Sequence, residues 1–574
     1  MKNIKLKLIQ AYKEGKFFEV ISKEYHKNRI ILGKTIVSLH NKNEIDVVEE
    51  FLELSNNSEA YNFFTVRHAF EEALPEIKSP LLSVMKCVKH LIEEAGNDLA
   101  ATHVLNSFIL YCEKDIELPK EAIQLIENQP DEWIEFTIPV IIAGTNLNLS
   151  EFIDSAVKLC KNENISIRQQ VTVGLGRINY DDKTEQIKHS LEILKNILLD
   201  EDDEIIIGNA IQSLFSLYLA DNSLEEEITN LIKKYKKNKS RQICYSISKL
   251  FGLKTDKIPL NLIDVITDSL KTVQANEYGI IENIDFGIRH LLKSKHIDKG
   301  IDLLEELLTQ NDNELSIKVF KSTISEIYNN ETLLNRIVTR WFLSRKLTLC
   351  KAVADIFHFG NSDFKAIGLA SIELKNNNKD SYTYLARKAI GWLYTRPVSC
   401  ISFILSMVDY ISDDLNEITN LMVNPMIISY PGQINEYLEK VKPNSTAQRK
   451  KVINAVIKKW KSYLDEIKSV DELPELWISE HHKDTFKRMY SKEMEKAFKE
   501  SEKKSFIHQF FPKSILLYGR ASIFFSVGQD GKKHRQEIPL QNIGHAMEYP
   551  RLQNIDPQGL DFKLRIFRIE RCII

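Results

Sequence analysis

The chain holds few of the residues that punctuate strands and tight turns. It has 20 glycines and 15 prolines among 574 residues, about half the share that is usual in globular proteins. Long helices tolerate this shortage, whereas a chain of many short strands and tight turns does not. The length suggests three or four domains, or one long repeat array.

Cysteine is also scarce, and its spacing excludes several kinds of site. The seven cysteines are scattered, and no two of them form a Cys-x-x-Cys pair. Neither a disulfide framework nor a thiolate zinc site is expected. We predict no metal and no cofactor, and we expect a reducing cytoplasmic location.

Long apolar runs are missing as well. The most apolar stretches, 133–144 and 514–527, are interrupted by Glu135 and Arg520. A membrane-spanning helix needs about 20 apolar residues, and the first 20 residues lack the apolar core of a signal peptide. We therefore expect no membrane partner.

Most of the chain repeats one pattern. From about residue 60 to residue 440, stretches of 12 to 18 residues with apolar positions three and four apart alternate with short breaks rich in Asn, Asp and Lys. This spacing predicts amphipathic helices. The clearest pairs are 149–164 with 165–178 and 184–199 with 204–217, and their second helices align at an offset of 39 residues.

A period of 36 to 40 residues with two helices per unit resembles the HEAT and armadillo class of α-solenoid. In that class the second helix commonly follows an acidic turn and carries an early basic residue. The turns 162–164, 201–203 and 311–313 fit, as does Arg168, but Ile207 stands where the next unit would repeat the arginine. The resemblance implies a mostly α fold, a right-handed α-solenoid of antiparallel helix pairs. It implies no particular function.

Glycine and proline return near the end of the sequence. Residues 512–574 hold 5 glycines and 4 prolines, so we expect the fold type to change near Pro512. The stretches 514–518, 521–527 and 532–538 favour strands around the Asp530-Gly531 turn. Alternating residues over 561–570 predict a last strand.

These patterns divide the chain into four predicted parts. They are an N-terminal helical cap over 1–60, a HEAT/armadillo-like α-solenoid over 61–440, a basic helical zone over 441–511 and a small β-rich C-terminal module over 512–574. Two long helices, 445–468 and 479–506, are predicted within the basic zone.

The net charge of −3 conceals an asymmetry. Residues 441–574 contain 26 Lys/Arg and 17 Asp/Glu and carry +9, so residues 1–440 carry −12. A basic end on an acidic chain suggests an anionic partner. The candidate nucleic-acid contacts are Arg449, Lys450, Lys451, Lys458, Lys459, Lys532, Lys533, His534, Arg535, Arg565 and Arg568.

Two other interpretations of these cations stay open. A lysine-rich helix face is often simply solvated, and an acidic protein would suit the same charges as DNA or RNA. The loop over 233–241 has six cations in nine residues. It either extends the basic surface or is a solvated connection between helices.

Catalytic motifs are largely missing. The sequence has no P-loop, no His-Glu-x-x-His, no Gly-x-Ser-x-Gly and no Cys/His metal spacing. Two weak candidates remain. His481, His482 and Asp484 start a predicted helix and could ligate a metal or hold a phosphate. Asp561 and Lys563 would share a face of the predicted last strand and, with Asp530 or Asp556 upstream, could hold Mg²⁺ as in nucleases of the PD-(D/E)xK type.

We therefore expect a non-enzymatic scaffold or recognition subunit. It would bind protein subunits of a larger assembly on its helices and DNA or RNA at its basic end. A bacterial anti-phage defence system is one hypothesis for that assembly, suggested by fold class and composition. The alternatives are a pure protein–protein scaffold and a Mg²⁺-dependent nuclease in the C-terminal module.

Overall fold

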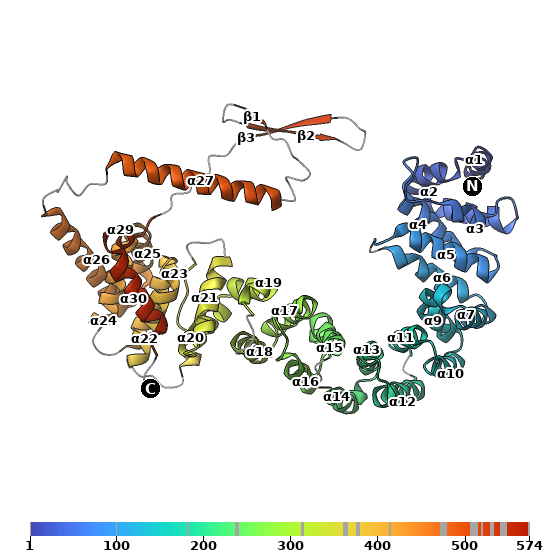
Figure 1. Ribbon diagram of the computed structural model, residues 1–574, viewed down its shortest axis with the longest axis horizontal. Helices are drawn as coiled ribbons and strands as arrows, with labels where there is room; N and C mark the ends of the chain where they lie inside the picture. The colour runs from blue at the N-terminus through green and yellow to red at the C-terminus, as the bar shows by residue number, and fades with distance from the viewer. Residues whose placement is uncertain are drawn as a thin grey trace. The chain divides into compact units, whose positions relative to one another are not determined.

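The computed structural model describes residues 2–98, 100–180, 183–235, 240–310, 315–359, 365–374, 379–411, 415–470, 479–504, 515–517, 521–527, 533–539 and 548–571. These residues are mostly helical, which confirms the predicted class. They form two compact units, Met1–Asn330 (unit 1) and Glu331–Ile574 (unit 2) (Figure 1). The division differs from the predicted boundaries at 60, 440 and 511, which stay predictions.

Unit 1 is built of helices joined by short turns. Its α-helices are α1 Lys2–Lys13, α2 Phe17–Asn41, α3 Val47–Glu50, α4 Phe63–Ala73, α5 Leu81–Ala95, α6 Val104–Cys112, α7 Glu117–Asn128, α8 Pro130–Trp133, α9 Thr137–Leu147, α10 Leu149–Leu159, α11 Ile165–Leu175, α12 Thr184–Asp200, α13 Glu204–Ala220, α14 Glu225–Lys233, α15 Arg241–Lys254, α16 Leu260–Leu270, α17 Tyr278–Lys293, α18 Ile297–Thr309 and α19 Lys321–Asn329. The two helix pairs expected at 149–178 and 184–217 are confirmed as α10 with α11 and α12 with α13.

Three alternate helices of unit 1, α11, α13 and α15, begin at a polar cap, and these caps recur at nearly constant spacing. Asn164 accepts hydrogen bonds from the backbone N–H groups of the first turn of α11. Asp203 does the same for α13 and Ser240 for α15. These side chains satisfy N–H groups that have no partner within the helix. The caps lie 39 and 37 residues apart in the sequence.

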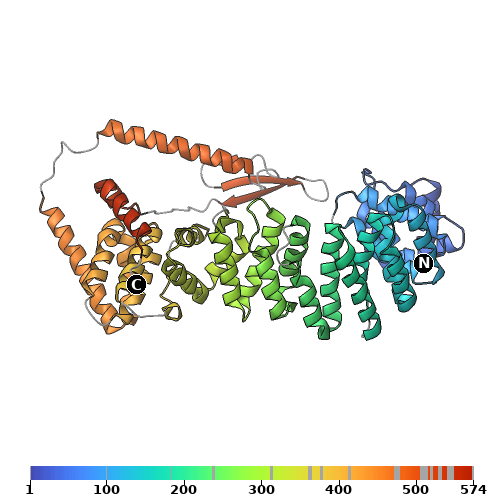
Figure 2. The same cartoon turned by 60° about the horizontal axis from the view of Figure 1, so that its bottom comes forward.

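Within unit 1, helices two positions apart in the chain pack against each other. Helices α9, α11, α13, α15, α17 and α19 contact one another in that order, and α10 contacts α12 as α14 contacts α16. Figure 2 shows these helices side by side. Polar side chains also bridge the series: Ser213 Oγ donates to the Thr172 carbonyl at 2.7 Å, and both oxygens of buried Asp285 accept N–H groups at the start of α19.

Close approach in this series requires small residues. A Cβ atom on Gly176 would lie 2.7 Å from Cα of Ser213 on α13, so glycine allows the close approach there.

Unit 2 combines further helices with one small sheet. Its elements are α20 Glu331–Leu343, α21 Leu347–Phe359, α22 Lys379–Leu393, α23 Pro397–Met407, the 3-10 turn η9 Val408–Tyr410, α24 Asn416–Leu421, the π-helix η10 Met422–Ile427, α25 Pro431–Val441, α26 Ala447–Lys468, α27 Glu480–Lys504, β1 Ile515–Leu517, β2 Ala521–Val527, β3 Lys533–Pro539, α29 Leu552–Ile555 and α30 Pro557–Ile569. Helices α26 and α27 confirm the two long helices expected in the basic zone.

The strands form an antiparallel sheet in the order β1-β2-β3. Ala521 of β2 lies opposite Pro539, and Val527 lies opposite Lys533. The strands expected over 514–538 are therefore present, with β1 limited to Ile515–Leu517. The tip of the β2–β3 hairpin, which includes Asp530-Gly531, lies outside the described residues.

The strand predicted over 561–570 is wrong, because residues 561–569 belong to helix α30 and Glu570 is its C-cap. Asp556 caps the helix by accepting the Gly559 N–H at 2.9 Å, and proline at the first helical position suits a helix start. Leu560 and Leu564, four residues apart, form its buried side. Packing on α22 thus overrides the apparent alternation of the sequence.

Among the described residues, no helix is both long and apolar enough to cross a membrane.

Candidate nucleic-acid interface

Helix α26 is the most basic element that the structure describes, and its position is well defined. The Thr446 side chain accepts the Arg449 N–H and caps the helix. Val452, Ile453, Val456 and Trp460 are buried against η9, η10 and α24. Their spacing of three and four residues places them on one face of α26.

The opposite face of α26 carries a row of exposed cations. Lys451, Lys458 and Lys461 are exposed, and their spacing of seven and three residues puts them on one side of the helix. We call these three residues the α26 lysine stripe. Within the described residues, no carboxylate lies within ion-pair distance of them. Exposed Asp465 follows Lys461 by one helical turn on the same side, so the stripe together with this neighbour keeps a net positive charge.

The other predicted contacts on α26 are less available. Arg449 forms an ion pair with Asp409 at 2.7 Å. Lys459 donates a hydrogen bond to the Asn420 side chain at 2.5 Å. Lys450 is half-buried. These three side chains fix α26 to its neighbours or border the stripe.

The predicted hairpin cluster is described only in part. Lys533, His534 and Arg535 lie on β3, and Lys532 lies outside the described residues. Arg535 is exposed and faces Phe525 across the ladder.

The two predicted contacts on α30 have other partners. Arg565 forms an ion pair with Asp561 at 2.8 Å, one helical turn away. Arg568 turns inward: its Nε donates to the Gly391 carbonyl at 2.6 Å, and its guanidinium lies 5.6 Å from the centre of the Trp392 ring. Arg568 is thus a packing residue, and only Arg565 stays exposed.

The geometry required for the nuclease hypothesis is not present on α30. Asp561 and Lys563 are two residues apart on a helix, which directs their side chains to different sides. Lys563 donates to the Asn424 side chain at 2.8 Å, while Asp561 is paired with Arg565. Asp556 caps α30, and Asp530 lies outside the described residues. The described residues contain no group of three His, Cys, Asp or Glu side chains that could hold a metal ion.

The histidine pair at the start of α27 lies in solvent. His481 and His482 are exposed, and their ring centres are 6.2 Å apart. Ser479 Oγ, just before the helix, lies 2.8 Å from Nδ1 of His482. This arrangement is a solvated helix start.

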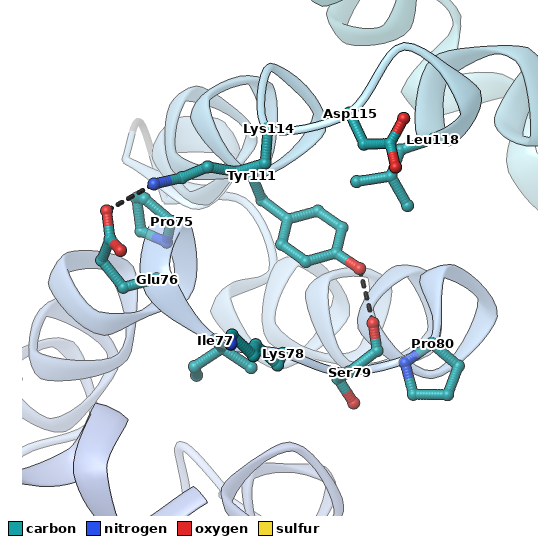
Figure 3. Close-up of a pocket in the computed structure, with 10 residues that line it drawn as sticks. All are labelled: Pro75, Glu76, Ile77, Lys78, Ser79, Pro80, Tyr111, Lys114, Asp115 and Leu118. Atoms are coloured by element: carbon teal, nitrogen blue, oxygen red, sulfur yellow. Dashed lines mark hydrogen bonds and ion pairs between the residues drawn. The ribbon is translucent and has the colours of Figure 1, made fainter. Parts of the chain in front are cut away.

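Unit 1 contains a cavity of about 530 Å³ (Figure 3). It lies between the residues before α5 and the turn after α6. Tyr111 donates to the Ser79 carbonyl at 2.6 Å, and Lys114 pairs with Glu76 at 2.5 Å. Burial raises the pKa of Tyr111 to about 12, so its hydroxyl stays protonated at neutral pH. The pocket therefore offers paired polar groups and apolar walls.

Burial also makes the described cysteines poor nucleophiles. It raises the pKa of Cys350 to about 11 and that of Cys160 to about 12. The pKa of Cys87, Cys112 and Cys400 is raised further. Because the thiolate is the reactive form, these thiols are expected to be inert.

The two units differ in net charge slightly more than residues 1–440 and 441–574 do. Residues 1–330 carry a net charge of −13 and residues 331–574 carry +10. In the basic loop of unit 1, Lys233, Lys234 and Arg241 are exposed, and residues 236–239 lie outside the described residues. The exposed stripe on α26 thus belongs to a unit that is basic as a whole.

Comparisons with known proteins add little to this site. No protein-family model matches the chain, and no curated protein is similar to it in sequence. Among solved structures, it is similar to the crystal structure of an engineered protein from the Northeast Structural Genomics Consortium, with 14% identity and a TM-score of 0.26, over 72% of this chain and 98% of that chain. A likeness this weak says nothing about the function of this chain.

Proposed function

We propose that the protein is a non-enzymatic recognition subunit or scaffold whose helices form a HEAT/armadillo-like α-solenoid and whose helix α26 binds nucleic acid. The alternating helix contacts of unit 1 and the caps spaced by 39 and 37 residues support the solenoid. In such repeats each helix pair contacts only its neighbours. Protein subunits of a larger assembly would bind the helical layers.

The α26 lysine stripe is the observation that carries the nucleic-acid function. Lys451 and Lys458 are about 10 Å apart along the helix axis, and Lys458 and Lys461 are about 5 Å apart. Three aligned cations on an anchored helix can contact successive phosphates at little entropic cost. The contacts are to the backbone, so binding is expected to be independent of sequence. Arg535 on β3 would supply a further cation.

The test replaces the three lysines of the α26 lysine stripe with glutamine. In the triple variant Lys451→Gln/Lys458→Gln/Lys461→Gln, the affinity of the intact chain for a fluorescent DNA duplex is measured by anisotropy over a series of salt concentrations. Each lost phosphate contact lowers the slope of log affinity against log salt by about 0.9. We expect weaker binding and a slope reduced by about two to three.

A matched control separates the stripe from net charge. The variant Lys254→Gln/Lys257→Gln/Lys295→Gln removes the same charge from exposed lysines of unit 1 and should leave DNA affinity nearly unchanged. Equal losses in both variants would show that only overall charge matters. If neither variant changes affinity, or the intact chain does not bind DNA or RNA, a pure protein scaffold is the better description.

A further inference from the structure

Helix α30 has apolar residues on two sides. Leu560 and Leu564 are 4% and 7% exposed and face the unit. Phe562, Ile566 and Ile569 are 68%, 41% and 64% exposed. The second set is spaced by four and three residues and therefore forms one stripe on the solvent side of the helix. We call these three residues the α30 apolar stripe.

The stripe is presented by a helix that is firmly held. Helix α30 packs on α22, as Figure 1 shows. Buried Lys388 donates to the Arg568 carbonyl at 2.6 Å, and Arg387 pairs with Glu570 at 2.7 Å. Arg568 in turn donates to the Gly391 carbonyl. These bonds join residues 177 to 183 positions apart in the sequence, so α30 is a fixed part of unit 2.

The size of the stripe indicates what kind of partner it fits. A stable dimer of two copies takes about 800 Å² from each partner. Three side chains spread over about 10 Å of helix supply much less. An amphipathic helix docks through anchors with the same i, i+4, i+7 spacing and needs only a stripe of this length.

The charge beside the stripe indicates which helix would bind. Arg565 precedes Ile566 and its side chain is 71% exposed. Its ion pair with Asp561 lies at the surface, where such pairs are weak and exchange partners readily. Arg571, just after the helix, is exposed too, and unit 2 carries +10.

We propose that the α30 apolar stripe docks an acidic amphipathic helix of a partner protein. Apolar anchors of the partner pack on Phe562, Ile566 and Ile569, and its carboxylates meet Arg565 and Arg571. This site is separate from the α26 lysine stripe and does not depend on nucleic-acid binding.

The experiment measures peptide binding to the intact chain by fluorescence anisotropy. The probe is a labelled peptide of about 18 residues, long enough to form a helix, with leucines at i, i+4 and i+7 and glutamates on the flanks. A second peptide carries lysines in place of the glutamates. We expect the acidic peptide to bind, and the double variant Phe562→Ala/Ile569→Ala to bind it about tenfold more weakly.

Controls make each outcome decisive. Ile372→Ala removes an exposed apolar residue elsewhere in unit 2 and should leave peptide affinity unchanged. The proposal is overturned if the lysine peptide binds as tightly as the acidic one, or if the double variant binds like the unaltered chain. It is also overturned if sedimentation shows a dimer that the double variant abolishes, because the occupant is then a second copy.

The same variants separate this proposal from the function proposed for α26. The double variant on α30 should keep its DNA affinity, and the triple lysine variant on α26 should keep its peptide affinity. Loss of both activities in both variants would show general damage to unit 2, which would contradict two independent surfaces.

Discussion

Helices α26 and α30 lie in the same unit and hold similar mixtures of cations and large apolar residues, yet they present opposite surfaces. Helix α26 buries Trp460 together with Val452, Ile453 and Val456, and exposes lysines. Helix α30 buries Leu560 and Leu564, turns Arg568 inward and exposes Phe562. The same residue types therefore form a basic surface in one place and an apolar surface in the other.

The difference comes from the width of the apolar face. On α26 the buried residues Val452, Ile453, Val456 and Trp460 form one stripe that η9, η10 and α24 cover, and Ile467 near the end of the helix is 47% exposed. On α30 apolar residues surround much of the helix, so α22 can cover only part of them. A helix that is apolar on more than one side needs more than one neighbour. Net charge alone does not distinguish these cases.

The largest expected effect comes from removing the anchor of α26. Trp460 is 5% exposed, and the Arg551 guanidinium lies 5.7 Å from the centre of its ring. Trp460→Ala should lower the free energy of unfolding of unit 2 by about 3 to 5 kcal/mol, through lost burial and a cavity. Denaturant unfolding of the intact chain measures it.

An exposed neighbour provides the comparison for that change. Lys458→Ala, half a turn away on the same helix, should change stability by less than about 0.5 kcal/mol while weakening DNA binding. A loss below about 1 kcal/mol for Trp460→Ala would mean that α26 is not held by its apolar face.

The two sides of α30 should respond differently to the same kind of truncation. Leu564 is 7% exposed and Phe562 is 68% exposed. Leu564→Ala should cost about 2 to 4 kcal/mol in the free energy of unfolding, whereas Phe562→Ala should cost less than about 0.5 kcal/mol. Thermal and denaturant unfolding compare them directly. Equal losses would show that Phe562 is covered in solution and would remove the basis of the docking site.

Most features of α26 could be predicted from the sequence. Its cap, its length and its apolar face follow from local spacing, since Thr446 and the residues at intervals of three and four lie within one short stretch. What the sequence could not show is which cations stay free. Arg449 pairs with Asp409, and Lys459 with Asn420, across 39 or more positions, and such pairing depends on the tertiary fold.

Helix α30 shows where that reasoning fails. The alternation of Phe562, Leu564 and Ile566 with charged residues suits a strand as well as a helix. Contacts with α22, about 180 residues earlier in the chain, stabilise the helix over the strand. The start signal Asp556-Pro557 favoured a helix and was the local clue that could have corrected the prediction. The α30 apolar stripe could not be predicted either, because it forms only when the segment is a helix that packs on α22.

The last expected effect concerns the lysine beneath α30. Burial lowers the pKa of Lys388 below its ordinary value of 10.5. Between the two pKa values the unfolded chain binds the proton and the folded chain does not. The free energy of unfolding should therefore rise as pH increases toward 10.5, by at most about 1.4 kcal/mol per pH unit.

Substitution isolates this contribution from the tyrosines that titrate in the same range. In Lys388→Met the charge that burial penalises is gone, so the rise of stability with pH should be smaller than in the unaltered chain. Lys351→Met, at an exposed position of α21, should keep the full rise. Unfolding curves of the three proteins, taken from neutral pH to 10.5, give the slope of the free energy of unfolding against pH. Identical slopes for Lys388→Met and the unaltered chain would show that Lys388 is as well solvated under α30 as the lysines of the α26 stripe. The contrast between the two helices would then fail at that position.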